Sequence, residues 1–146
     1  AMIAGIARGV AVVLEDGQIM DTLVHGLGNL VGELPGLLSA IGMYFAQLGF
    51  NFVVPSGSGQ ALVTMPIMAP LADLIGVTRQ TAVLAYQLGD GIGNILYPTS
   101  GYFMATLALA GVPWQKWVKF FFPLFCTWVL ISLCLLAFAQ AIQWTG

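Results

Sequence analysis

The sequence predicts an all-α membrane protein made of one inverted-repeat half: a re-entrant helical hairpin, a broken transmembrane helix and a final transmembrane span. Three observations lead to this fold class. Hydrophobic residues make up 59% of the 146 residues, charged residues only 7%, and the mean hydropathy is +0.93. Long stretches contain no charged side chain, and a helix that crosses the hydrocarbon core needs about 20 apolar residues. Two of these apolar stretches are interrupted in their middle by short polar segments.

The same composition argues against several classes of function. A formal net charge of -2 gives no basic surface for phosphates, so we expect no nucleic-acid partner. Cys126 and Cys134 lie in an apolar run without metal-ligand spacing, and no nucleophile–base arrangement is apparent. We therefore expect no enzyme and no cofactor. The first residue is Ala, and no signal peptide is visible in residues 1–9, so we also expect that the beginning of the protein is missing.

The first 34 residues predict two short helices. Residues 2–14 are apolar and rich in small residues except for Arg8, and Glu15 and Asp16 follow in a polar turn, which predicts the end of a transmembrane helix at residues 1–16. Residues 17–34 place apolar side chains on one helical face and Asp21, His25 and Glu33 on the other, which predicts an amphipathic interfacial helix. His25 is then expected to face solvent or lipid headgroups.

Residues 35–72 predict a re-entrant hairpin. This apolar segment is interrupted by NFVVPSGSGQ, residues 51–60, and too few apolar residues lie on either side for a full span of about 20. Irregular backbone at membrane depth is tolerated only where protein or water satisfies its polar groups. The tip is therefore expected to line a polar site. The alternative is a surface loop that joins two short helices.

Residues 78–111 predict a discontinuous transmembrane helix, interrupted by YPTSG at residues 97–101. Its first half carries Gln87, Asp90 and Asn94 at spacings that place them on one face. A carboxylate near the middle of a bilayer costs about 2.5 kcal/mol or more on insertion scales, so Asp90 is by default a functional candidate. The alternative is a packing residue that bonds to an Asn or to backbone.

Residues 114–146 predict a plain transmembrane helix that anchors the chain in the lipid bilayer. Trp114 and Trp117 precede its apolar run and Trp144 follows it, the arrangement of aromatic belts at the two membrane interfaces. Pro123 falls near the expected start of the helix, where a missing N–H is tolerated.

Two interrupted segments in one chain indicate the midplane site of a secondary transporter. Gln60 and Gly101 are expected to open the half-helices, whose positive dipole ends favour an anion, whereas Asp90 favours a cation or carries a proton. Transporters of this kind contain two inverted repeats, so a matching half is expected elsewhere in the protein. A channel subunit and a structural membrane subunit are the alternatives. The candidate substrate- and ion-binding residues are Asn51, Ser56, Gly57, Ser58, Gly59, Gln60, Gln87, Asp90, Asn94, Pro98, Thr99 and Ser100.

Three stretches resemble a known family: GIARGVAVVLEDGQIMDTLVHGL, NFVVPSGSGQALVTMPIMAPLADLIGVTRQTAVLAYQLGDGIGN and YPTSG. They are similar to the carboxyl-terminal part of the YfcC-like carriers, in the anaerobic C4-dicarboxylate carrier group of the ion transporter superfamily. The resemblance implies a multi-pass, often dimeric, transporter of the bacterial inner membrane for a dicarboxylate or an amino acid.

The resemblance also implies a coupling ion, Na⁺ or H⁺. Matching the family's hairpin tip and broken-helix loop places a sodium site near Ser56, Ser58, Thr99 and Ser100. Many superfamily members carry Ser-Asn-Thr at the hairpin tip, whereas this sequence has Ser-Gly-Ser at residues 56–58.

The positive-inside rule predicts the orientation of the last span. Lys116 and Lys119 place the loop before this span in the cytoplasm, so its end is expected outside. In intact cells, a membrane-impermeant thiol reagent should label the variant Thr145→Cys and leave Gln115→Cys unlabelled. The reverse labelling pattern would invert the topology.

Overall fold

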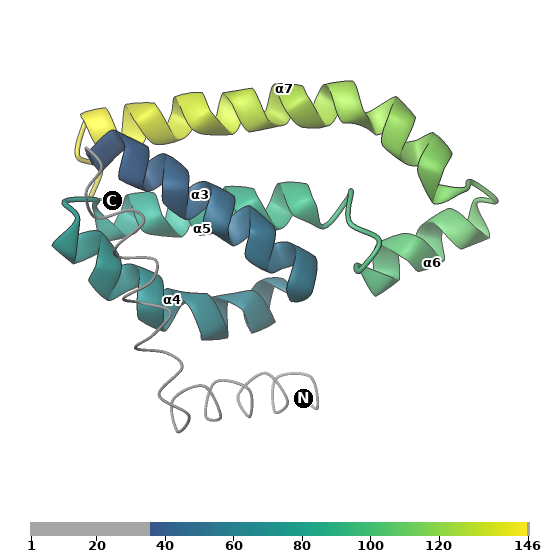
Figure 1. Cartoon of the computed structure of the whole chain (residues 1–146), viewed down its shortest axis with the longest axis horizontal. Coiled ribbons are helices and arrows are strands. Elements are labelled where there is room, and N and C mark those ends of the chain that lie inside the picture. Colours follow the sequence, from purple (N-terminus) through teal and green to yellow (C-terminus); the bar gives the residue numbers. More distant parts are fainter. Residues whose placement is uncertain (1–35, 146) are drawn as a thin grey trace.

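The computed structural model describes residues 36–145, and this range is helical without strands (Figure 1). An all-helical protein is therefore confirmed for the described residues. The predicted helices at residues 1–16 and 17–34 lie outside them. The described helices are α3 (Gly36–Val53), α4 (Gly57–Leu74), α5 (Arg79–Gly93), α6 (Gly101–Leu109) and α7 (Trp114–Ala141).

Helices α3 and α4 are joined by three non-helical residues, 54–56, and run in opposite directions in Figure 1. The expectation that Gln60 opens the second helix is wrong, because α4 begins at Gly57. The hydroxyl of Ser56 accepts a hydrogen bond from the Gly59 N–H at 3.4 Å, and this N-cap starts the helix three residues earlier.

Helices α5 and α6 are separated by the non-helical residues 94–100. Thr78 caps α5 by accepting a hydrogen bond from the Thr81 N–H at 3.2 Å. The interruption starts earlier than the expected residues 97–101, because α5 already ends at Gly93. Helix α6 begins at Gly101, as predicted.

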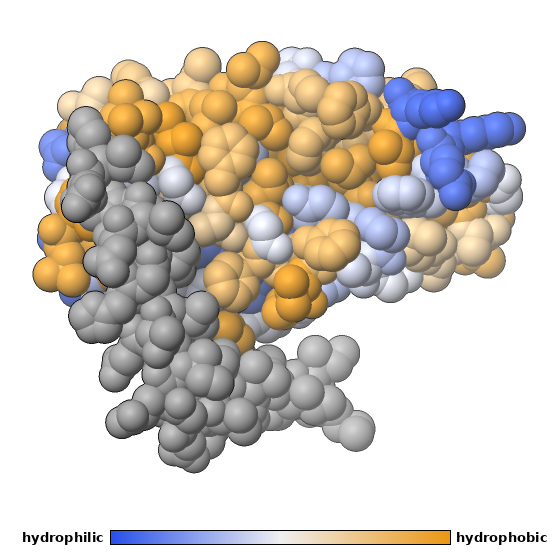
Figure 2. Space-filling model, in the orientation of Figure 1, coloured by the Kyte–Doolittle hydropathy of each residue, from blue (hydrophilic) through white to orange (hydrophobic). Residues whose placement is uncertain are grey.

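Helix α7 is the longest described helix and packs against α3 and α5 (Figure 1). It begins at Trp114, so Pro123 lies inside the helix and the expectation of a position near its start is wrong. Two described helices, α3 and α7, are long and apolar enough to cross a membrane. Only 17% of the most apolar stretch of α7 is buried, and the surface over this helix is largely hydrophobic (Figure 2). This exposure fits a lipid-facing helix better than the core helix of a soluble protein.

Small residues bring α3 and α5 close together. Ala40 of α3 and Ala82 and Ala85 of α5 are fully or almost fully buried in one apolar cluster. A Cβ atom added to Gly89 would lie 3.0 Å from the backbone nitrogen of Leu48. Such small contact residues are typical of helix pairs in membranes, because they let the backbones approach. The close approach positions the polar residues of both helices against each other.

We predict that Gly89→Ala lowers the melting temperature of the full-length protein in detergent. The added methyl group meets backbone that must shift, and such overpacking costs about 1–3 kcal/mol. Gly91→Ala is the matched control, since a Cβ atom there meets nothing within 4 Å. Alanine improves helix propensity at both positions, so only Gly89→Ala should destabilise. Equal melting temperatures for the two variants would contradict the close contact.

Candidate functional site

A chain of buried polar side chains connects α3, α4 and α5. The Gln60 amide nitrogen donates to the side-chain oxygen of Gln47 at 2.8 Å and to the Gln47 backbone carbonyl at 2.8 Å. The Asn51 amide nitrogen donates to the Gln60 side-chain oxygen at 3.0 Å and to Asp90 Oδ1 at 2.7 Å. Asn94 donates to the same Asp90 oxygen at 2.8 Å. We call these five residues the amide chain.

The amide chain is almost completely removed from solvent. Gln47, Asn51 and Gln60 are fully buried, Asn94 is buried and Asp90 is partly buried. The amide orientation of Asn51 is fixed by its neighbours, because a carboxylate and an amide oxygen both require a donor. The Asn51 Oδ1 atom therefore faces Gly93. A Cβ atom added to Gly93 would lie only 2.4 Å from this oxygen.

Helical spacing explains how the sequence builds the amide chain. Gln47 and Asn51 are four residues apart on α3, and Asp90 and Asn94 are four residues apart at the end of α5, so each pair shares a face. Gln60 lies in the first turn of α4. Sequence reasoning missed Gln47, although a glutamine four residues before Asn51 in an apolar helix was an available signal.

The amino end of α4 lies beside Asp90. A Cβ atom added to Gly57 would lie 2.9 Å from Asp90 Oδ2, so glycine allows the carboxylate to approach the helix end. The Tyr86 hydroxyl donates to the Gly57 carbonyl at 2.6 Å and holds the two helices together. The positive end of the α4 dipole therefore faces a carboxylate of the chain itself. Tyr86 was also missed, because a tyrosine in an apolar helix carries no special signal.

Aromatic side chains bond to backbone carbonyls in and around the interruption between α5 and α6. The indole N–H of Trp117 donates to the Ile95 carbonyl at 3.0 Å, and that of Trp114 donates to the Leu96 carbonyl at 3.0 Å. The Tyr97 hydroxyl donates to the Leu48 carbonyl at 3.2 Å. Trp114 and Trp117 therefore donate hydrogen bonds to the backbone, which their interpretation as an aromatic belt did not include.

The structure brings together only some of the predicted site residues. Asn51, Gly57, Gln60, Asp90 and Asn94 meet around the amide chain. The other candidates take different positions. Gln87, Ser58, Pro98 and Thr99 are exposed, Ser56 caps α4 with Gly59 as its partner, and Ser100 is buried with its hydroxyl unpaired within residues 36–145. A sodium site at Ser56, Ser58, Thr99 and Ser100 stays a prediction.

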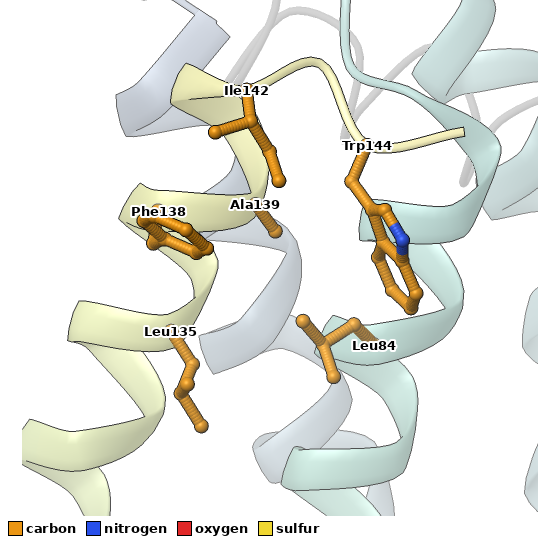
Figure 3. Close-up of a pocket in the computed structure, with 6 residues that line it drawn as sticks. All are labelled: Leu84, Leu135, Phe138, Ala139, Ile142 and Trp144. Carbon is orange, nitrogen blue, oxygen red and sulfur yellow. The ribbon is translucent and has the colours of Figure 1, made fainter. Parts of the chain in front are cut away.

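An apolar pocket of about 200 Å³ lies apart from these residues, between the start of α5 and the end of α7 (Figure 3). Leu84 and Trp144 face the side chains of α7 across it. Its lining contains neither a charged residue nor a member of the amide chain, so we do not place the candidate site there. The pocket is lined by Leu84, Leu135, Phe138, Ala139, Ile142 and Trp144.

Comparison with known proteins gives consistent matches. The sequence profile of the family described as "DcuC: C4-dicarboxylate anaerobic carrier" matches residues 1–141. A protein of Escherichia coli named "Putative basic amino acid antiporter YfcC" is 42% identical over 124 residues, which is 82% of this chain and 24% of that protein. An uncharacterized protein of Haemophilus influenzae is 40% identical over 136 residues, which is 93% of this chain and 26% of that protein.

The chain therefore spans about a quarter of the length of these two relatives. No solved structure matches it.

We predict that Asn51→Ala destabilises the full-length protein. The substitution leaves the buried oxygen of Gln60 without a donor and removes one donor from Asp90, and each unsatisfied buried group costs about 1–3 kcal/mol. Gln87→Ala removes an exposed amide on α5 and should leave the midpoint of denaturant unfolding nearly unchanged. If both variants unfold at the same midpoint, the amide chain does not stabilise the fold.

Proposed function

The chain belongs to the C4-dicarboxylate anaerobic carrier family, and on this premise we propose that it is the carboxyl-terminal part of an ion-coupled or exchange transporter in a bacterial inner membrane. The names of the family and of the Escherichia coli relative both describe transport. The transporter is multi-pass, and the rest of the protein supplies the second half of the site. A homodimer is part of the same proposal.

The observation that carries this proposal is the amide chain ending on Asp90. It joins the interruption between α3 and α4 to the interruption between α5 and α6, because Asn51 and Gln60 flank the first and Asn94 belongs to the second. Interrupted helices that meet at polar groups are typical of the midplane sites of secondary transporters. A purely structural subunit needs no carboxylate at this place.

The proposed membrane arrangement is a re-entrant hairpin, a discontinuous helix and a final span. At 1.5 Å per residue, α3 and α4 are each about 27 Å long, close to the roughly 30 Å hydrocarbon core, so the hairpin is proposed from the polar tip between them and not from their lengths. Asp90 lies about 17 Å along α5 from Arg79, which is near mid-depth if that helix starts at the membrane edge. Helix α7 is about 42 Å long and crosses the bilayer with room for tilt.

The charge of the site favours a substrate with a cationic group. Asp90 is its carboxylate, and no lysine or arginine within residues 36–145 bonds to the amide chain. Buried oxygens of Asn51, Asn94 and Ser100 have no hydrogen-bond partner there, so the described part of the chain leaves acceptors unused. The amino end of α4 is already beside Asp90, so a substrate carboxylate has less to gain from it.

A basic amino acid fits these charges better than a dicarboxylate. Its ammonium or guanidinium group would face Asp90, while its carboxylate would bind groups from the other half of the transporter. The printed name of the Escherichia coli relative supports this choice, and the family name supports a dicarboxylate as the alternative. Asp90 would in addition carry the coupling proton or help to hold a coupling sodium ion.

We predict that Asp90→Asn in the full-length protein abolishes accumulation of a radiolabelled basic amino acid in proteoliposomes, because the neutral amide cannot pair with a cation. Asp73→Asn is the matched control. Its carboxylate is exposed and bonds to Arg79 at 2.6 Å, and this hydrogen bond lowers the pKa of Asp73. The control should transport like the wild type.

Three outcomes would contradict parts of the proposal. Unchanged accumulation by Asp90→Asn would make this residue a packing residue. Exchange of dicarboxylates but not of basic amino acids would overturn the substrate choice. Steady single-channel currents, in place of saturable uptake or exchange, would identify a channel.

A further inference from the structure

The carboxyl end of α5 and the interruption that follows it need hydrogen-bond donors for their backbone carbonyls. The last four carbonyl groups of an α-helix have no partner within it, and an interruption removes the next turn that would supply them. Here the backbone N–H groups of Leu96 and Tyr97 both bond to the Gly93 carbonyl. The carbonyls of Ile95 and Leu96 instead receive the indole N–H groups of Trp117 and Trp114.

The two tryptophans are three residues apart at the start of α7, so both project from the same side of the helix toward the interruption. The Trp117 ring stacks on Phe121, with ring centroids 5.5 Å apart and planes at 10°. It also contacts Phe103 of α6, with centroids 5.9 Å apart. Trp117 is therefore held from α6 and α7 while its N–H group reaches Ile95, two residues beyond the end of α5.

This arrangement fixes the backbone next to the candidate site. Ile95 directly follows Asn94, which bonds to Asp90, and the same interruption ends at the buried Ser100. An indole has one donor and no acceptor, so each tryptophan matches one carbonyl. Loss of either donor would leave a carbonyl unsatisfied in an apolar environment and favour opening of the interruption.

We propose that Trp114 and Trp117 are positioning residues for transport: a pair of indole donors on the last span that holds the interruption between α5 and α6 in its binding geometry. The transport part of this inference rests on the proposed function. The positioning part does not, because it concerns only whether the interruption keeps Ser100 buried, which we call the closed state.

The first test measures closure by the reactivity of Ser100→Cys in full-length protein that lacks Cys126 and Cys134. Ser100 is fully buried, so a water-soluble methanethiosulfonate should react slowly with the new thiol. Adding Trp117→Phe or Trp114→Phe should accelerate the reaction about tenfold, the factor that corresponds to losing one buried hydrogen bond. Trp128→Phe is the matched control. The Trp128 and Phe121 ring centroids are 5.6 Å apart, but the Trp128 indole N–H donates to no group within residues 36–145.

A second variant separates the hydrogen bond from the packing of the ring. Replacing Trp117 with 3-benzothienylalanine keeps the ring shape but exchanges the N–H group for sulfur. This protein should show the same faster labelling as Trp117→Phe. If labelling stays at the wild-type rate while Trp117→Phe is faster, ring packing holds the interruption and the proposed role of the donors is wrong.

The transport readout uses the same variants in proteoliposomes without Ser100→Cys. We expect a several-fold higher KM with little change in kcat for Trp114→Phe and Trp117→Phe, and neither change for Trp128→Phe. Unchanged labelling and unchanged KM would overturn the inference. If even the wild type does not transport, the proposed function fails, and the labelling rates still decide whether the indoles hold the interruption.

Discussion

The structure depends on one constraint: polar groups that lie among apolar helices must bond to one another. Both interruptions create such groups, since each exposes backbone and the first carries several polar side chains. The protein satisfies many of them in two ways, whereas the side-chain oxygens of Asn51, Asn94 and Ser100 have no partner within residues 36–145. Between α3 and α4 the amide chain links three helices through Asn51 and Gln60. Between α5 and α6 the carbonyls bond to tryptophans of α7. The interruptions are therefore integral parts of the packing.

Asp90 is the residue through which the amide chain reaches Asn94, the first residue of the interruption between α5 and α6. One of its oxygens accepts hydrogen bonds from Asn51 and Asn94, and the other lies near the amino end of α4. Both its interpretation as a packing residue bonded to Asn and its interpretation as a functional carboxylate agree with this geometry. Because the Asp90 carboxylate bonds to Asn51 of α3 and lies beside the amino end of α4, a bound cation that drew this carboxylate away would alter the contact between all three helices.

The sequence predicted the helical class, and its list of candidate site residues contains four of the five members of the amide chain. Asn51, Gln60, Asp90 and Asn94 were identifiable because polar residues are rare in apolar segments and therefore stand out. The remaining contacts depend on tertiary packing. Which face of α3 meets α4 decides the role of Gln47, and the close approach of α4 to α5 decides that of Tyr86. The local sequence pattern indicates neither which face of α3 meets α4 nor how closely α4 approaches α5.

Trp114 and Trp117 are a second case in which the local sequence pattern did not predict a tertiary contact. An aromatic belt is a tendency of many membrane helices, and it treats the indole N–H as a group that faces lipid headgroups or water. Here the carbonyls of Ile95 and Leu96 in the interruption lie within hydrogen-bond distance of the two indoles. The two hydrogen bonds satisfy both carbonyls. Helix α7 is then more than an anchor, because any movement of α5 relative to it must break or carry along these two bonds. Helix α7 and the interruption are thus expected to move together.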